Sequence, residues 1–241
     1  PGTCYIEMAR AMVRQQHGGT AFSLSDVEFQ SIMFLDETDL RGAPTVRLRL
    51  QRQRASSQLT ITSRLEEGAW ETHAVMEVEL RATEAAKPLY VDLVQSRCPE
   101  HVDGDTFYAN TGNDYQGEFR ALTEAWGGSS AGEALGRVEY AQAEMQNVHL
   151  RSCAWLDTCT HLWWWGDHRA RPSYAASVRS YNVLRMNVTN NKAMWSHMTV
   201  DTESEEGDLH YFDATRSGVM RIEGSKMGFF ELGSLEARRA H

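Results

Sequence analysis

The chain lacks any run of apolar residues long enough to cross a bilayer, and no signal peptide opens it. It is also poor in basic charge, with 24 Lys and Arg against 33 Asp and Glu and a net charge of −9. Binding to phosphate backbones needs a basic face, so nucleic acid is excluded as the main partner. These absences predict a cytoplasmic protein that binds neither membrane nor nucleic acid.

Cysteine is scarce, and the four cysteines form no Cys-x-x-Cys pair and no metal-ligand spacing with histidine. They are Cys4, Cys98, Cys153 and Cys159. This pattern predicts free thiols in a reducing compartment, most simply as small buried residues. The sequence also has no nucleophile elbow, and its Gly-Gly pairs lack the context of a phosphate loop. We therefore expect neither a metal nor a bound cofactor.

What the chain does have is the composition of a soluble globular protein. Its 241 residues are 41% hydrophobic and 24% charged, which suits one large domain or two small ones with a sizeable core. Seven tryptophans are many for this length. They indicate broad apolar walls, either around a long apolar ligand or for packing alone.

Residue periodicity predicts one helix followed by antiparallel strands in the first third of the chain. Apolar residues recur at intervals of three and four from 4 to 16, and Thr3 is placed to cap that helix. The stretch 45–52 alternates strictly between apolar and polar residues, as a half-exposed strand does. The strands are expected at 22–34, 45–52, 58–65 and 70–80.

The rest of the chain repeats this order of elements, although no sequence repeat accompanies it. After a loop at 97–105 we expect a short helix from 105 or 106, a second helix within 147–167, and further strands. These later strands are expected near 122–126 and 134–144, and at 178–186, 194–200, 209–215 and 219–230.

One helix wrapped by an antiparallel sheet, twice over, is the α+β double hot-dog architecture. The predicted boundaries are 1–86 for the N-terminal hot-dog, 87–105 for the linker between the repeats, and 106–241 for the C-terminal hot-dog.

The stretch 147–167 holds the most informative pair of residues. Asp157 and His161 are four residues apart, so they share one face of a helix. Their neighbours are mostly apolar, and an acid in such surroundings tends to stay protonated, which suits a proton donor. The alternative is structural: the aspartate caps its helix, and the histidine is its hydrogen-bond partner.

Several segments, in order, resemble the dehydratase domain of modular polyketide synthases and, less closely, that of animal fatty acid synthase. The resemblance runs through the whole chain, and the order and spacing of the segments make it specific. PGTCYIEMA resembles the PGTGYLEMA end of the family's HxxxGxxxxP motif, and LDTCTH resembles its LDxxxQ/H motif. The other similar segments lie at 26–29, 70–74, 97–100, 107–109, 115–119 and 221–224.

The resemblance implies a double hot-dog lyase that removes water from a 3-hydroxyacyl chain held on an acyl carrier protein. A histidine takes the proton from carbon 2, and an aspartic acid protonates the leaving hydroxyl. Asp157 matches the acid, and His161 matches the residue that positions it and contacts the hydroxyl. Four matched residues would line the substrate pocket: Tyr115, Phe119, Pro1 and Gly2. For Phe119 a purely structural role is the alternative.

This sequence departs from the family pattern in three places. The general-base histidine would lie just upstream of Pro1, so the chain as given would have an acid without its base. The YGPxF motif is altered to Tyr-Gln-Gly-Glu-Phe at 115–119. Ser152 and Cys153 stand where the family often has His-Pro.

The resemblance further implies that the chain acts beside an acyl carrier protein and neighbouring synthase domains, as a homodimer and without a cofactor. Two alternatives to dehydration stay open. One is a cyclase or double-bond-shifting domain with the same pocket, and the other is a non-catalytic module. Retention of Asp157 argues against the isomerase-like relatives, in which the acid is commonly replaced.

Overall fold

The computed structural model describes residues 2–18, 22–33, 43–54, 56–65, 68–80, 88–111, 113–128, 132–139, 148–165, 173–183, 193–201 and 203–229. The first element is the helix α1 (Gly2–His17), which buries an apolar face that includes Ile6, Ala9 and Val13. The predicted helix at 4–16 is therefore confirmed. Thr3 lies inside α1 and does not precede it, so its predicted role as a cap is wrong.

Four strands follow α1 in an antiparallel group with the order β2-β3-β4-β1. In β3, buried and half-buried residues alternate, which is the pattern of a strand with one face on the core. The strands are β1 (Ser23–Phe29), β2 (Thr45–Arg52), β3 (Ser57–Arg64) and β4 (Glu71–Glu79). All four predicted strands are present, and β2 has the predicted bounds.

The second half holds seven strands in the order β8-β11-β10-β9-β7-β6-β5. They are β5 (Glu100–Asp103), β6 (Leu122–Gly127), β7 (Glu133–Glu139), β8 (Ser173–Val183), β9 (Ala193–Asp201), β10 (Glu206–Asp213) and β11 (Gly218–Phe229). Three of these strands precede the central helix α4 (Val148–Thr160). Two of them, β6 and β7, lie where strands are predicted before that helix, whereas β5 was not predicted.

Two elements lie where the sequence predicts only loop or linker. The helix α2 (Val91–Arg97) and strand β5 both fall within 87–105, and β5 pairs with β6 at the edge of the sheet. Four residues are too few to show a strand periodicity, so β5 depends on its partner strand. The predicted domain boundaries themselves stay a prediction.

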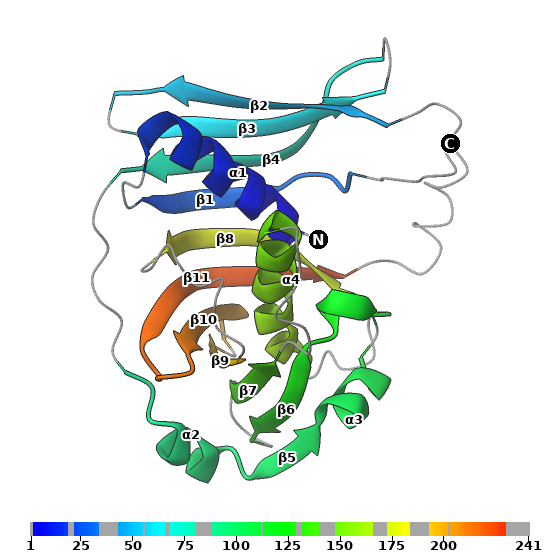
Figure 1. Ribbon diagram of the computed structural model, residues 1–241, viewed down its shortest axis with the longest axis vertical. Helices are drawn as coiled ribbons and strands as arrows, with labels where there is room; N and C mark the ends of the chain where they lie inside the picture. The colour runs from blue at the N-terminus through cyan, green and yellow to red at the C-terminus, as the bar shows by residue number, and fades with distance from the viewer. Residues whose placement is uncertain are drawn as a thin grey trace.

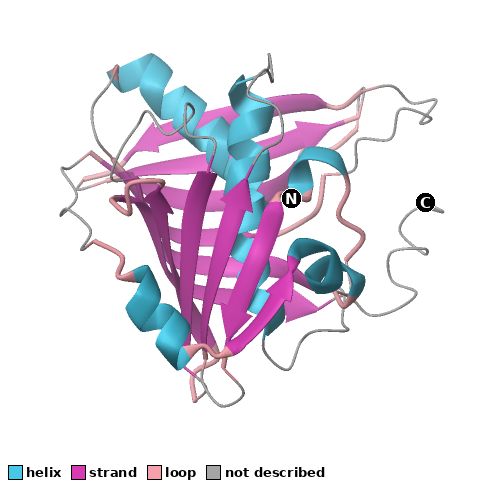
Figure 2. Ribbon diagram, turned by 60° about the horizontal axis from the view of Figure 1, so that its bottom comes forward, coloured by secondary structure: helices cyan, strands magenta, loops and turns pink. Residues whose placement is uncertain are grey.

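Among the described strands, one pairing joins the two halves. Strand β1 pairs with β8, with Leu24 opposite Tyr181 and Val27 opposite Val178, which makes one eleven-stranded antiparallel sheet. Figure 1 shows α1 crossing the strands of the first half and α4 crossing those of the second, on the same face. Figure 2 shows the sheet curving around these helices. The two helices contact each other, so residues of both halves share one core.

Glycines in the strands make room for the tryptophans of the central segment. The helix α4 continues into a short 3-10 helix, η2 (His161–Trp165). A Cβ atom on Gly127 would lie 1.8 Å from the indole nitrogen of Trp165, and one on Gly207 would lie 2.3 Å from the Trp163 ring. The rings of Trp163 and Trp165 therefore pack directly on strand backbone, which fixes the position of the segment that carries His161.

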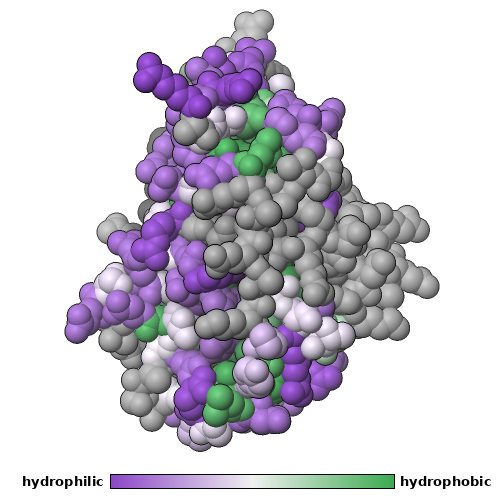
Figure 3. Space-filling model, turned by 90° about the vertical axis from the view of Figure 1, so that its left-hand side faces the viewer, coloured by the Kyte–Doolittle hydropathy of each residue, from purple (hydrophilic) through white to green (hydrophobic). Residues whose placement is uncertain are grey.

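The helix α2 covers the opposite face of the second half. Ala134 and Tyr211 belong to the main core, while the next residues, Leu135 and Phe212, form a separate apolar cluster with α2. This alternation is the expected consequence of strand geometry. On the side shown in Figure 3, the described residues are mostly hydrophilic, and the apolar ones among them form small patches.

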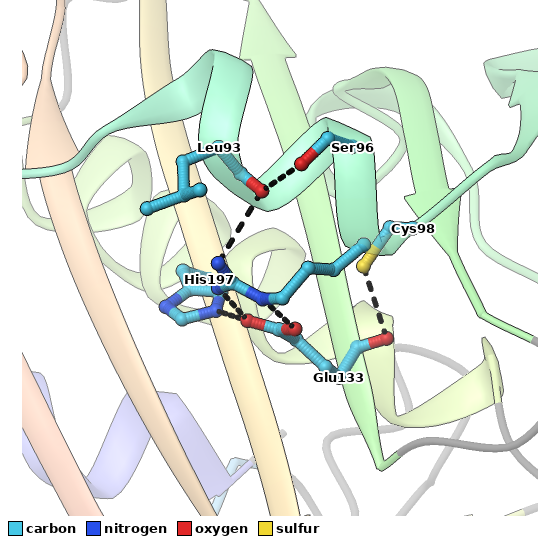
Figure 4. Close-up of polar contacts among 6 residues, drawn as sticks. Leu93, Ser96, Cys98, Glu133 and His197 are labelled. Atoms are coloured by element: carbon cyan, nitrogen blue, oxygen red, sulfur yellow. Dashed lines mark hydrogen bonds and ion pairs between the residues drawn. The ribbon is translucent and has the colours of Figure 1, made fainter.

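Polar contacts at the end of α2 fix it to the sheet (Figure 4). Arg97 donates two hydrogen bonds to the carboxylate of Glu133, at 2.6 and 2.8 Å, and the His197 ring lies 2.8 Å from the same carboxylate. The bond from Arg97 holds the pKa of Glu133 below its usual range. None of the helices within the described ranges is both long enough and apolar enough to span a membrane.

Candidate active site

Asp157 lies in the last turn of α4, not at its start. The capping alternative is therefore excluded, because a capping aspartate precedes the first turn of its helix. The side chain of Asp157 is 14% exposed, whereas that of His161 is 1% exposed. The carboxyl is thus partly accessible, whereas Leu156 and Cys159 are buried on either side of it in the sequence.

The two carboxyl oxygens of Asp157 have different partners. Oδ2 lies 3.2 Å from Nε2 of His161, as the i, i+4 spacing predicts. Oδ1 accepts a hydrogen bond of 3.2 Å from the hydroxyl of Thr3 on α1. The acid is therefore oriented by one residue from each half of the fold, at the place where α1 and α4 meet.

Tyr108 contacts the ring nitrogen of His161 that does not face Asp157. It lies on the short helix α3 (Gly104–Ala109), whose N-cap Asp103 accepts a hydrogen bond from the amide of Thr106. The Tyr108 hydroxyl accepts from the amide of Leu122 at 3.1 Å and lies 3.1 Å from Nδ1 of His161.

Burial raises the pKa of Tyr108, so the hydroxyl keeps its proton. A Tyr108 hydroxyl that donates to Nδ1 pairs with an imidazole whose ring proton is on Nε2, on the side of Asp157. Both ring nitrogens of His161 are occupied in this arrangement.

Tyr115 is the predicted pocket residue that the structure brings to this pair. Its ring centroid is 3.8 Å from that of His161, and Asn113 donates a hydrogen bond of 2.9 Å to its hydroxyl. Phe119 is half-buried at the end of the 3-10 turn η1 (Gly117–Phe119), which contacts α4.

The two predicted residues at the start of the chain are less informative. A Cβ atom on Gly2 would lie 3.1 Å from the ring of Phe29, so its backbone packs on that ring. Pro1 lies outside the described residues.

Sequence reasoning missed two residues that contact the acid–histidine pair. Thr3 and Tyr108 both lie in segments that carry the family resemblance, which was the available signal, but nothing in the local pattern indicates that they meet Asp157 and His161. Within the described ranges, no three His, Cys, Asp or Glu side chains form a group that could hold a metal ion.

Comparison with solved structures defines the class of fold. The dehydratase domain of the CurK module of the curacin polyketide synthase matches with a TM-score of 0.82 and 21% identity, over 97% of this chain and 85% of that one. The CurF dehydratase matches with a TM-score of 0.81 and 18% identity, over 95% and 84%. A dehydratase domain of a mycocerosic acid synthase-like polyketide synthase matches with a TM-score of 0.77 and 21% identity, over 95% and 82%. The fold is a double hot-dog of the α+β class, as predicted.

Family models define the protein more closely. A model described as the polyketide synthase dehydratase domain matches residues 1–64, and one described as the polyketide synthase dehydratase N-terminal domain matches residues 86–235. The chain belongs to the polyketide synthase dehydratase family. It is a dehydratase domain of a modular polyketide synthase, with that family's general activity on 3-hydroxyacyl thioesters. A search of curated proteins found no match.

The matched structures also include two inactive mutants of the CurK dehydratase. In one an aspartate is replaced by asparagine, and in the other a histidine is replaced by phenylalanine.

Proposed function

We propose that Asp157 is the general acid of this dehydratase and that His161 and Thr3 position it. The observation that carries the proposal is the double anchoring of a mostly buried carboxyl, at 3.2 Å on each oxygen, by residues of both halves. Loss of activity in the aspartate-to-asparagine mutant of the CurK dehydratase supports an acid in this role in a related fold.

In the proposed reaction, a base removes a proton from carbon 2 of the 3-hydroxyacyl thioester, and the electrons of that C–H bond form the double bond to carbon 3. The bond from carbon 3 to oxygen breaks as Asp157 donates its proton to that oxygen, and water leaves. Each carboxyl oxygen has a second lone pair beyond the one used by Thr3 or His161, so the carboxyl can hold the acidic proton.

His161 is unsuited to be the base, because Tyr108 and Asp157 occupy both of its ring nitrogens. We propose instead that the base is a histidine of the polypeptide upstream of Pro1, as the family resemblance implies. A segment that enters α1 from upstream would approach Asp157 beside Thr3, which supports this arrangement. The inactive histidine mutant of the CurK dehydratase is consistent with a histidine base in that protein.

We further propose that the acyl chain binds beside Tyr115, and that Phe119, Pro1 and Gly2 line the same pocket. Tyr115 has the strongest support, because its ring lies on His161 and its hydroxyl is held by Asn113. The substrate would arrive on the phosphopantetheine of an acyl carrier protein, and no other cofactor takes part. A homodimer within the synthase module is part of the same proposal.

The test compares residues 1–241 with a chain extended upstream through the expected histidine. Each is mixed with a 3-hydroxyacyl thioester on a carrier protein, and the acyl group is followed by mass spectrometry. We expect loss of one water with the extended chain. In that chain Asp157→Asn should reduce the rate at least about a hundredfold, because general acid catalysis contributes that much.

Asp105→Asn is the matched control, because this carboxylate is 95% exposed on α3. It should leave the rate unchanged. An Asp157→Asn chain that dehydrates at the normal rate would remove Asp157 from the reaction. No water loss from either unsubstituted chain would favour the cyclase or non-catalytic alternatives, which a substrate with a second hydroxyl would separate.

A further inference from the structure

One polar side chain lies in the otherwise apolar row of β9 that faces the core. Met194 and Met198 belong to the main core, and Ser196 lies between them, fully buried. Trp195 points to the opposite face, where it packs on the separate apolar cluster with α2. A buried hydroxyl without a partner costs free energy, so a serine at this position needs a hydrogen-bond acceptor inside the core.

The acceptor belongs to the backbone of the central helix. The Ser196 hydroxyl donates a buried hydrogen bond of 2.7 Å to the carbonyl of Cys159. Cys159 lies in the last turn of α4, where the carbonyls lack donors within the helix itself. Strand β9 therefore binds the end of α4 at one defined atom, in addition to packing against it.

This hydrogen bond lies between the two residues of the acid–histidine pair. Asp157 precedes Cys159 by two residues in α4, and His161 follows it by two as the first residue of η2. The α-helix changes into the tighter 3-10 helix between Thr160 and His161, and the place of that change sets the direction in which the His161 ring leaves the backbone. A fixed Cys159 carbonyl therefore helps to fix the 3.2 Å contact between Asp157 and His161.

The strands beside β9 hold the same junction by close packing. Gly136 of β7 and Tyr211 of β10 occupy the positions opposite Ser196. A Cβ atom on Gly136 would lie 2.9 Å from the side chain of Leu162, the residue that follows His161 in η2. The start of η2 thus packs on strand backbone next to Ser196, so the sheet holds the junction of α4 and η2 both by packing and by the hydrogen bond.

We propose that Ser196 is a positioning residue of the dehydratase, which acts on the acid–histidine pair through the carbonyl of Cys159. The proposal rests on the proposed role of Asp157 as the general acid. Without the serine hydroxyl, the buried carbonyl lacks that donor, which favours a rearrangement of the junction between α4 and η2. His161 then moves relative to Asp157, and the carboxyl loses part of the orientation that proton transfer to the leaving hydroxyl requires.

The test measures dehydration and the state of the His161 ring in the same variants. Dehydration is followed in the chain extended upstream through the expected histidine, with a 3-hydroxyacyl thioester on a carrier protein. Ser196→Ala should lower kcat about tenfold and leave KM nearly unchanged, because an orienting hydrogen bond is lost while the substrate contacts stay. In residues 1–241, nitrogen-15 NMR should show shifted imidazole signals for His161, and unchanged signals would contradict the proposal.

Ser63→Ala is the matched control, because it removes another buried serine hydroxyl, which lies 2.7 Å from Nε2 of His73 in the first half. It should lower the stability in urea unfolding, while the rate of dehydration and the His161 signals stay unchanged. Equal losses of rate in Ser63→Ala and Ser196→Ala would show that Ser196 only stabilises the fold.

Two further variants separate the possible failures. Ser196→Cys keeps the size of the side chain and weakens the donor, so it decides the question if Ser196→Ala does not fold. It should also lower kcat, and a full rate in either variant, once folded, would overturn the proposal. Asp157→Asn in the same extended chain tests the acid itself. If this variant loses the rate while the Ser196 variants keep it, only the role of Ser196 is wrong, whereas an active Asp157→Asn chain would contradict the proposed function.

Discussion

The hydroxyl of Thr3 donates to the carboxyl of Asp157 across 3.2 Å, although 154 residues separate them in the chain. This bond is the point at which the helix of the first half contacts the acid carried by the helix of the second. Both halves therefore contribute to the site. Thr3 of α1 binds one carboxyl oxygen, and His161, which directly follows α4, lies beside the other.

Thr3→Val should lower the rate of dehydration about tenfold in a chain that carries its base. Valine keeps the shape of threonine but cannot donate, and a hydrogen bond that orients a reacting group contributes about 1.4 kcal/mol. Single-turnover kinetics on a carrier-bound substrate would measure the effect. Thr62→Val is the matched control, since its hydroxyl donates to the backbone carbonyl of Arg47 on a neighbouring strand. Equal losses in both variants would mean that the Thr3 hydroxyl has no specific role.

Tyr108→Phe should destabilise the fold and change the tautomer of His161. The substitution removes the partner of two buried groups, the amide of Leu122 and Nδ1 of His161, and an unsatisfied buried polar group costs about 1–3 kcal/mol. Urea unfolding would measure the stability, and nitrogen-15 NMR of the imidazole would report which nitrogen carries the proton. Tyr90→Phe is the control, because Tyr90 is 66% exposed. Unchanged imidazole signals in Tyr108→Phe would contradict the assignment of the tautomer.

His210 should make the stability of the fold depend on pH in the weakly acidic range. Burial lowers the pKa of His210 to about 4, with further lowering by Arg221 and His197 and a small opposing effect of Asp208. Arg221 and His197 occupy the opposite positions on the two strands beside β10. In the weakly acidic range, the His210 imidazole is therefore neutral in the folded chain, whereas it is already protonated in the unfolded chain.

The sign of the effect follows from proton counting. Between the unfolded pKa near 6.5 and the folded value of about 4, the unfolded chain binds more protons, so stability falls as pH falls. His210→Gln should reduce this slope in urea unfolding measured from pH 7 to pH 4.5. His17→Gln, at an exposed position, should keep it. An unreduced slope in His210→Gln would assign the pH dependence to other groups.

Local pattern was enough for most of the strands and for the acid–histidine spacing. The bounds of β2 follow from strict alternation over 45–52, and the i, i+4 interval alone places Asp157 beside His161. Both predictions depend on the regular repeat of a strand or a helix, which a short stretch of sequence is enough to reveal. Strand β5 has too few residues to show a period, and it forms because β6 supplies its hydrogen bonds.

By itself, the sequence determined the class of elements, the apolar segment at 147–167 and the presence of an acid with a histidine one turn away. Through its resemblance to a family, it also indicated the double hot-dog and the dehydratase chemistry. Only the tertiary structure decided that Thr3 meets Asp157 and that Tyr108 meets His161. The physical reason is that these contacts join residues far apart in the chain, and their formation depends on the pairing of β1 with β8 and the packing of α1 on α4.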